Sequence, residues 1–219
     1  MKLSGKLPEK LFGKLSGKKI AILATDGFEH SELFEPLKAL KAEGATVEIV
    51  SLKMGEIKSW KNDNWGETIE VQKMVNSVSA ADYHGLVLPG GVINPDRLRA
   101  DDDAVEFVAS FFADGMQKPV AAICHGPWML VEADVVSGRR VTSYKSIRTD
   151  LENAGAVWQD EEVVVDAGLV TSRSPKDLPA FMKCMVDEFA EGIHKVESQI
   201  GNGPITNESI LGSAGADRV

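Results

Sequence analysis

A cysteine followed directly by a histidine is the pair of side chains in this sequence best suited to covalent chemistry. Cys124 and His125 stand in the string Ala-Ile-Cys-His-Gly-Pro, after the short apolar run at residues 120–123. A thiolate is a nucleophile, and an imidazole beside it can accept and return protons near neutral pH. A lone cysteine at the end of an apolar strand is also a common small buried hydrophobe, so the surroundings must decide between the two roles.

The turn that carries Cys124 favours the chemical role. A residue at a strand-to-helix turn points across the carboxyl edge of an open α/β sheet, which is where such sheets bind ligands. Pro127 suits the first turn of the helix that follows, and a helix N-terminus places partial positive charge near the sulfur. The sequence therefore predicts a lowered pKa for Cys124 and a reactive thiolate.

Short apolar runs alternate with helical patterns along most of the chain. Residues 31–44 have the apolar spacing of a helix, with Ser31 as the expected N-cap, and residues 60–71 favour an edge hairpin. The alternation predicts an α/β fold, a single-domain doubly wound sandwich with a mostly parallel sheet and helices on both faces, flavodoxin-like. The expected buried strands are residues 20–25, 47–52, 85–88, 120–123, 163–165 and 169–172, and the further helices are residues 104–112, 146–154 and 178–189.

The two ends of the chain differ in composition from its middle. Residues 1–18 are rich in lysine and glycine and are expected to form an extension outside the core. Residues 19–192 carry the alternating pattern and form the predicted α/β domain. Residues 193–219 are polar and glycine-rich, so they are expected to be a flexible tail or a segment ordered only by a partner subunit.

Composition limits the classes of function. The formal net charge of −9 disfavours attraction to nucleic-acid phosphates, so no nucleic-acid groove is expected. No run has the character of a signal peptide or approaches about 20 apolar residues, which predicts a soluble cytoplasmic protein without membrane contact. The two cysteines are too few for a disulfide framework. Because no cysteine or histidine pair has metal-ligand spacing, we predict no metal and no cofactor.

Several motifs together resemble those of one family. Asp-Gly-Phe-Glu at residues 26–29, Pro-Gly-Gly at 89–91 and the string around Cys124 are joined by Glu-Val-Val-Val-Asp at 162–166 and Thr-Ser-Arg at 171–173. The chain thus resembles the PfpI family of the DJ/PfpI superfamily, with its class I glutamine amidotransferase-like fold, from about residue 19 to residue 191. The resemblance implies that Cys124 is the nucleophile and His125 its general acid and base.

The resemblance also implies supporting groups. The family's nucleophile-contacting glutamate falls on Glu29, whose protonated carboxyl would donate a hydrogen bond to the thiolate, while Glu32 is assigned a structural role. The backbone N–H groups of Gly91 and His125 match the oxyanion hole. Tyr144 matches a residue near the substrate pocket, and a half-buried strand tyrosine is an equally good interpretation.

An acid from a neighbouring subunit completes the family's site. The matching position is Asp96, in the loop after Pro-Gly-Gly, although a surface aspartate is the alternative interpretation. Val92 and Ile93 make that loop apolar, as expected of a segment that is covered. The resemblance therefore implies a homodimer or higher homo-oligomer with its site at the subunit interface.

Three functions remain open at this point. The first is an enzyme acting on reactive carbonyls, a glyoxalase or deglycase that converts methylglyoxal to lactate. The second is an intracellular cysteine peptidase or amidase with a peptide substrate, and the third is a redox-sensing stress chaperone in which the thiol is oxidised. His125 beside the thiol favours catalysis, because a sensor needs no proton shuttle. Cys184, among apolar residues of the last helix, is interpreted as structural.

Overall fold

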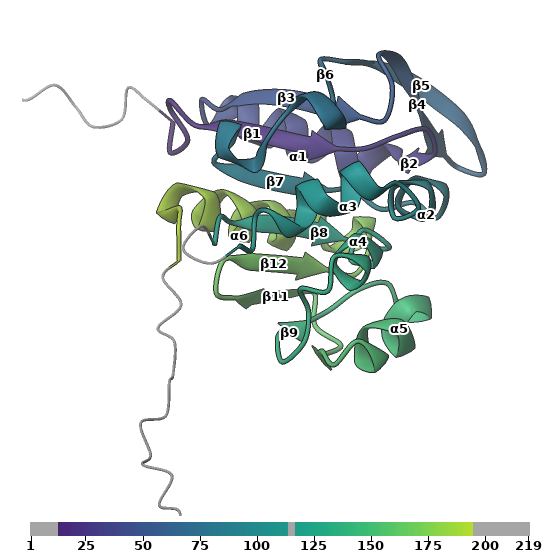
Figure 1. Cartoon of the computed structure of the whole chain (residues 1–219), viewed down its shortest axis with the longest axis vertical. Helices are drawn as coiled ribbons and strands as arrows, with labels where there is room; N and C mark the ends of the chain where they lie inside the picture. Colours follow the sequence, from purple (N-terminus) through teal and green to yellow (C-terminus); the bar gives the residue numbers. More distant parts are fainter. Residues whose placement is uncertain (1–12, 114–116, 195–219) are drawn as a thin grey trace, which may run out of the picture.

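The centre of the molecule is a seven-stranded sheet with the order β11-β12-β8-β7-β1-β3-β6 (Figure 1). The computed structural model describes residues 13–113 and 117–194. Neighbouring strands run parallel except for the pair β11 and β12, which confirms the predicted mostly parallel sheet. The strands are β1 (Lys19–Leu23), β3 (Thr46–Ser51), β6 (Lys73–Met74), β7 (Gly85–Leu88), β8 (Val120–Ile123), β11 (Val163–Asp166) and β12 (Leu169–Ser172).

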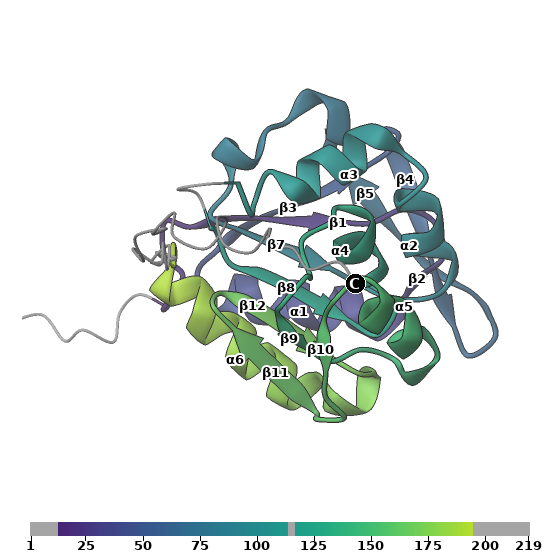
Figure 2. The ribbon, with the colours of Figure 1, turned by 60° about the horizontal axis from the view of Figure 1, so that its bottom comes forward.

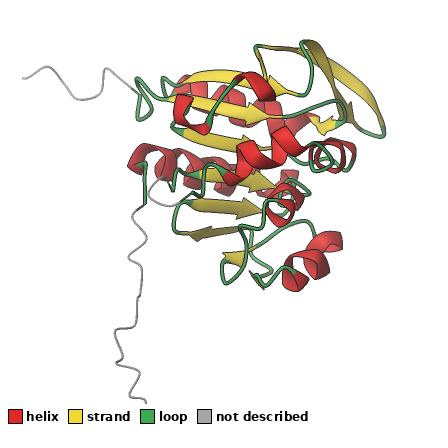
Figure 3. Cartoon of the chain, in the orientation of Figure 1, coloured by secondary structure: helices red, strands yellow, loops and turns green. Residues whose placement is uncertain are grey.

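Helices cover both faces of this sheet (Figures 2 and 3). On strand β1, Ala21 and Leu23 pack into one apolar cluster, while Ile20 and Ile22 pack into another on the opposite face. Because each strand is buried on both sides, its sequence is a continuous apolar run rather than an alternating one. The helices are α1 (His30–Ala42) and α6 (Leu178–Glu191) against one cluster, and α2 (Ile93–Leu98), α3 (Asp102–Ala109), α4 (Trp128–Glu132) and α5 (Arg148–Asn153) against the other.

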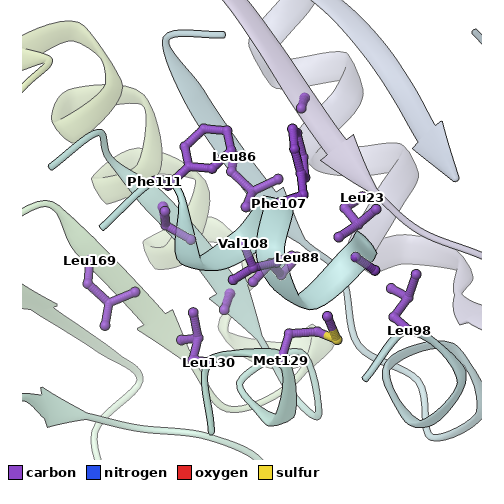
Figure 4. Packing of buried hydrophobic residues seen from close by; sticks show 14 of the residues in the cluster. Leu23, Leu86, Leu88, Leu98, Phe107, Val108, Phe111, Met129, Leu130 and Leu169 are labelled. Carbon is purple, nitrogen blue, oxygen red and sulfur yellow. The ribbon is translucent and has the colours of Figure 1, made fainter. Parts of the chain in front are cut away.

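The cluster beneath α3 and α4 supports the strands that lead to the site. Phe107 and Phe111 of the α3 region pack with Leu86 and Leu88 of β7 and with Met129 of α4 (Figure 4). All five side chains are at most 5% exposed. This packing fixes the ends of β7 and β8, and therefore the two loops that follow those strands.

A β-hairpin forms a second, smaller sheet rather than an edge of the main one. Strands β4 (Gly55–Lys61) and β5 (Asn64–Val71) are antiparallel, and β4 pairs with β2 (Phe28–Glu29) in a three-stranded sheet. Asn62 and Asp63 turn the chain with φ values of 49° and 60°, which asparagine and aspartate tolerate well. The predicted hairpin at residues 60–71 is confirmed, but its first strand begins earlier. A two-stranded sheet joins β9 (Arg140–Val141) to β10 (Val157–Trp158).

The expectation that residues 1–18 lie outside the core is wrong for Leu15. Its side chain is fully buried in the cluster beneath α1, and its N–H donates to the carbonyl of Glu43 over 2.9 Å. One apolar residue among lysines and glycines is enough to fasten this segment to the fold. Residues 1–12 and the predicted tail from residue 195 lie outside the described residues. None of the helices in the described part of the chain has the length and hydropathy that a membrane span requires.

Candidate active site

Cys124 lies immediately after β8, at the carboxyl edge of the sheet, in a left-handed backbone conformation. Its φ is 61°, which is uncommon for a residue with a β-carbon and is typical of strained functional turns. Its N–H donates to the carbonyl of Ser172 over 3.0 Å, and its carbonyl accepts from the N–H of Tyr144 over 2.9 Å. Neighbouring segments therefore hold the strained turn, and Cys124 as a whole is only 7% exposed.

The imidazole of His125 lies directly beside the thiol. Its Nδ1 is 3.2 Å from the sulfur of Cys124, and its Nε2 is 3.1 Å from the hydroxyl oxygen of Ser146. The ring stacks on Tyr144 with a centroid distance of 4.8 Å and meets Trp128 edge-on at 5.2 Å. Burial lowers the pKa of His125, so the neutral ring is available to accept a proton.

The carboxyl group that faces the thiol belongs to Glu32, which corrects the prediction that Glu29 makes this contact. Glu32 is fully buried, and its Oε2 accepts from the N–H of Gly90 over 2.9 Å. Its carboxyl lies close enough to the thiol for each group to shift the pKa of the other, while its Oε1 has no hydrogen-bond partner among the described residues. Glu29 instead caps helix α1, where its Oε2 accepts from the N–H of Glu32 over 2.8 Å and from the hydroxyl of Ser31 over 2.6 Å. The predicted cap at Ser31 is therefore also wrong.

A sequence signal for Glu32 exists. Glu32, Pro36 and Leu40 recur every four residues, and all three are buried on the face of α1 that packs against the sheet. A carboxylate on an apolar helix stripe is costly to bury unless it has a partner. That position, rather than the capping position three residues earlier, is where a buried functional acid is expected.

Burial and charge couple Cys124 to Glu32. Burial and, secondly, the charge of Glu29 raise the pKa of Glu32 to about 8, so Glu32 is largely protonated at neutral pH. Burial and the charge of an ionised Glu32 raise the pKa of Cys124, whereas hydrogen bonds from the backbone N–H groups of Gly91 and His125 lower it. Because a protonated Glu32 exerts no charge repulsion and can donate to sulfur, the two groups titrate as one coupled system.

The predicted lowering of the Cys124 pKa is thus wrong for the chain as described. Helix α4 begins only at Trp128 and has five residues, so it offers little of the favourable electrostatics that a long helix starting at Cys124 would supply. Desolvation of the buried thiol is the larger effect. Ionisation of the thiol is instead expected to depend on the proton held by Glu32.

Two glycines bring the backbone close to the sulfur. A β-carbon on Gly90 would lie 2.5 Å from Oε2 of Glu32 and 2.7 Å from the β-carbon of Cys124. Gly91 has a φ of 80°, and a β-carbon there would lie 2.5 Å from the carbonyl oxygen of Gly27. The turn therefore requires glycine at both positions. The backbone N–H groups of Gly91 and His125 both act on the sulfur, because both lower the pKa of Cys124. These are the two groups predicted to form the oxyanion hole.

Asn94 is a supporting residue that the sequence reasoning missed. Its side chain is fully buried, donates to the carbonyls of Pro89 and Gly90 over 2.9 and 3.2 Å, and accepts from the N–H of Thr25 over 2.7 Å. These bonds join the loops that follow β7 and β1, so Asn94 holds the glycine turn in place. The only feature of the sequence that could have indicated this role is that Asn94 is a polar residue at the start of a short helix after a glycine pair.

Asp96 makes no contact with His125 within the described chain. Its carboxylate is 2.8 Å from the guanidinium of Arg99, and its side chain is 56% exposed. Arg99 in turn lies over the ring of Trp128, 4.6 Å from its centroid. The predicted contact between Asp96 and a neighbouring subunit's histidine remains a prediction. The side chains of Val92 and Tyr144 are also exposed.

Among the described residues, one group could hold a metal ion: Glu188, Glu191 and His194, whose ligand atoms lie within 4.8 Å of one another. His194 lies near the start of β8, because its N–H donates to the carbonyl of Gln117, whereas Cys124 follows the end of that strand. The ion pair of 2.9 Å between His194 and Glu188 accounts for the grouping. These residues therefore take no part in the chemistry around Cys124.

The fold and the site together define a class. The chain is an α/β protein with a buried cysteine at a strained strand-to-helix turn, a histidine on one side of the sulfur and a carboxyl group on the other. The sequence model of the DJ-1/PfpI family matches residues 18–188, and this chain belongs to that family.

Three known proteins illustrate the relationship. A putative cysteine protease, YraA, from Bacillus subtilis is 46% identical over 164 residues, 75% of this chain and 94% of that protein. Protein/nucleic acid deglycase 2 from Escherichia coli is 44% identical over 165 residues, 75% of this chain and 93% of that protein. A crystal structure of a two-domain protein from Anabaena variabilis, with DJ-1/ThiJ/PfpI-like and ferritin-like domains, has a TM-score of 0.73 at 34% identity. It is matched over 78% of this chain and 47% of its own.

Proposed function

We propose that this protein is a cysteine-dependent enzyme of the DJ-1/PfpI type that acts on small reactive carbonyls, as a glyoxalase or deglycase. The observation that carries the proposal is the pair of proton-bearing groups beside Cys124, with His125 Nδ1 3.2 Å from the sulfur and the buried Glu32 carboxyl, whose pKa is raised to about 8, next to the thiol. The deglycase names of several relatives at about 44% identity support the same class of substrate.

The geometry accommodates a complete reaction on methylglyoxal. The sulfur of Cys124 adds to the aldehyde carbon, and the N–H groups of Gly91 and His125 stabilise the developing oxyanion until it is protonated. His125 then removes the proton from that carbon and returns it to the neighbouring ketone carbon. The first carbon is oxidised to a thioester while the second is reduced to an alcohol. Water cleaves the thioester to release lactate and the free thiol, and no external oxidant is needed.

A peptidase or amidase would use the same sulfur to form an acyl-enzyme. The name of one relative, a putative cysteine protease, supports this alternative. Cys124 is only 7% exposed in the chain, which favours a small aldehyde over the backbone of a folded polypeptide. A redox role, in which the thiol is oxidised to sulfinic acid, would need no proton transfer to substrate.

Two matched cysteine variants test the proposal. Wild type, Cys124→Ala and Cys184→Ala are each supplied with methylglyoxal, with a methylglyoxal-modified amino acid and with a peptide amide. Lactate release by wild type and Cys184→Ala, and its loss in folded Cys124→Ala, are the expected results. Amine release from the peptide amide without lactate would favour the peptidase. Absence of both, with sulfinic acid detected at Cys124 by mass spectrometry, would favour the redox role.

We also propose that the active unit is a homodimer or larger assembly. Two exposed side chains, those of Val92 and Tyr144, and the surface position of Asp96 support this proposal. The subunit-exchange experiment in the Discussion tests it.

A further inference from the structure

A pocket next to His125 is lined by aromatic and charged side chains. It has a volume of about 250 Å³ and is lined by aromatic rings of Tyr144 and Trp158 and by cationic side chains of Lys145, Arg173 and Lys176. Tyr144 belongs to both places, because its ring also stacks on His125. The reaction proposed for Cys124 makes no use of the other four residues.

The cations of this pocket are not equivalent. The guanidinium of Arg173 donates to Asp177 over 2.9 and 3.1 Å and to Asp160 over 2.9 Å. Both acids that line the pocket are therefore paired with Arg173 and join the end of β12 to the start of α6. In the described part of the chain, Lys145 and Lys176 have no carboxylate within 4.0 Å. Two lysines without a carboxylate partner among the described residues thus line one hollow in a chain of net charge −9.

The aromatic wall is held in place. The indole N–H of Trp158 donates to the hydroxyl of Ser143 over 3.0 Å, and the guanidinium of Arg148 lies 5.0 Å from the ring centroid. The ring of Tyr144 is held by stacking on His125. A pocket with planar apolar walls and unpaired ammonium groups suits an organic anion better than a neutral polar molecule or a cation.

The pocket connects to the proposed chemistry through three consecutive residues. Tyr144 stacks on the imidazole of His125, and Ser146 lies within hydrogen-bonding distance of its Nε2. Lys145, between them in sequence, lines the hollow. An anionic group bound by Lys145 would therefore lie next to Tyr144 and Ser146, the two residues that orient the imidazole of His125.

We infer that this pocket binds the anionic group, a carboxylate or a phosphate, of a substrate whose reactive carbonyl is attacked by Cys124. The inference rests on the proposed carbonyl chemistry and narrows its substrates to acidic carbonyl compounds or acidic adducts. The two ammonium groups supply charge, and Tyr144 and Trp158 contact the carbon skeleton between the anion and the carbonyl.

The first experiment measures the charge preference of the thiol without any turnover. The rate of alkylation of Cys124 is measured with anionic iodoacetate and with neutral iodoacetamide, and the ratio of the two rates is compared among proteins. In Lys145→Gln/Lys176→Gln the ratio is expected to fall about tenfold from the wild-type value. The matched control Lys41→Gln/Lys73→Gln changes the net charge equally at two exposed lysines elsewhere and is expected to keep the wild-type ratio.

The second experiment measures the preference in turnover. The values of kcat/KM are compared for 4-carboxyphenylglyoxal and its neutral isostere 4-carbamoylphenylglyoxal, and for hydroxypyruvaldehyde phosphate and methylglyoxal. Wild type is expected to have an about tenfold higher kcat/KM for the anionic member of at least one pair. The pair that shows this preference tells whether the pocket binds a carboxylate or a phosphate. The pocket double variant is expected to lose that preference, and the control double variant to retain it.

The two proposals can fail separately. If wild type turns over the neutral carbonyls but prefers neither anion, or if the pocket double variant keeps the preference, the pocket inference is wrong and the proposed function stands. An equal loss in the control double variant would also overturn it, because net charge alone would then explain the preference. If no carbonyl is turned over, the proposed function fails, and an unchanged alkylation ratio would overturn the pocket inference as well.

Discussion

The two sides of Cys124 differ in how completely a single chain builds them. On one side, Glu32 and Asn94 are fully buried, and the side chain of each is hydrogen-bonded to the backbone of Gly90, which lies next to Cys124. On the other, His125 contacts the exposed side chain of Tyr144, and Asp96 points its carboxylate to Arg99 rather than to the imidazole. We call these the closed side and the open side.

The difference teaches where the properties of the site originate. The closed side is fixed by the same packing that forms the sheet and α1, so its geometry follows from the folding of one chain. On the open side, within the described residues, no carboxylate reaches His125, and Ser146 is its only polar neighbour besides the thiol. Completion of the open side is therefore the property most sensitive to a second chain.

The largest expected effect is on the closed side. Glu32→Ala removes the buried carboxyl beside Cys124 and is expected to lower kcat/KM for methylglyoxal about 10²-fold, a usual size for a lost proton-transfer group. Glu32→Gln should recover part of this loss, because its amide can still donate to sulfur. Glu29→Ala is the control. Turnover that falls equally in Glu29→Ala would return the role to the capping glutamate.

The same carboxyl should make stability depend on pH. The pKa of Glu32 is raised by burial to about 8 in the folded chain from its ordinary value of 4.5, so between these values the folded state binds a proton that the unfolded state has lost. Stability linked to this group is therefore fully present below about pH 4.5 and falls as pH rises through about 8. The loss is on the order of a few kcal/mol. Chemical denaturation at several pH values should show a shallower decline for Glu32→Gln than for wild type, and parallel declines would contradict the assignment.

The fold was largely predictable because parallel strands buried on both faces appear in the sequence as short continuous apolar runs. The apolar runs that became β7, β8 and β12 have no competing interpretation once helical segments separate them. Leu15 was missed for the opposite reason, since a single apolar residue among polar neighbours carries no periodic signal. The start of β4 was missed because residues 55–58, which pair with β5, hold a single buried side chain, that of Ile57.

The site was predictable only where local sequence determines geometry. Cys124 and His125 are adjacent in sequence, and their backbone turn places them together. The contact of Glu32 with Cys124 depends on which face of α1 meets the sheet, and a glutamate three residues earlier matched the family motif as well. Likewise, the Cys124 pKa depends on burial, whereas the motif around it indicated only the helix that follows.

Asp96 offers a direct test of whether a second chain completes the open side. Asp96→Ala is expected to lower kcat/KM about tenfold if its carboxylate orients a histidine across an interface. When Asp96→Ala and Cys124→Ala proteins are mixed and exchange subunits in a twofold assembly, roughly a quarter of the wild-type activity should return. Each mixed dimer would contain one site with an intact thiol and an intact acid.

The control for this mixture is the exchange itself, followed by differently sized tags on the two variants. Exchange without activity above that of the Asp96→Ala protein would show that Asp96 does not act across an interface. The open side would then be complete in a single chain, and the comparison between the two sides would lose its physical basis.

The smallest expected effect is that of Ser146, the polar neighbour of His125 that the chain itself supplies. Its hydroxyl oxygen lies 3.1 Å from Nε2 of His125, but the imidazole is also held by stacking on Tyr144 and by its contact with the thiol. Ser146→Ala is therefore expected to lower kcat only about threefold, within the range of one modest hydrogen bond. Because Ser146 is assigned to positioning His125 rather than to contact with substrate, KM should stay at its wild-type value, and Ser146→Thr should restore kcat. A rise in KM with kcat unchanged would place Ser146 in the substrate pocket instead. If kcat and KM are both unaffected while Asp96→Ala is impaired, the carboxylate from the second chain has replaced Ser146 as the partner of His125, and the open side is built by two chains.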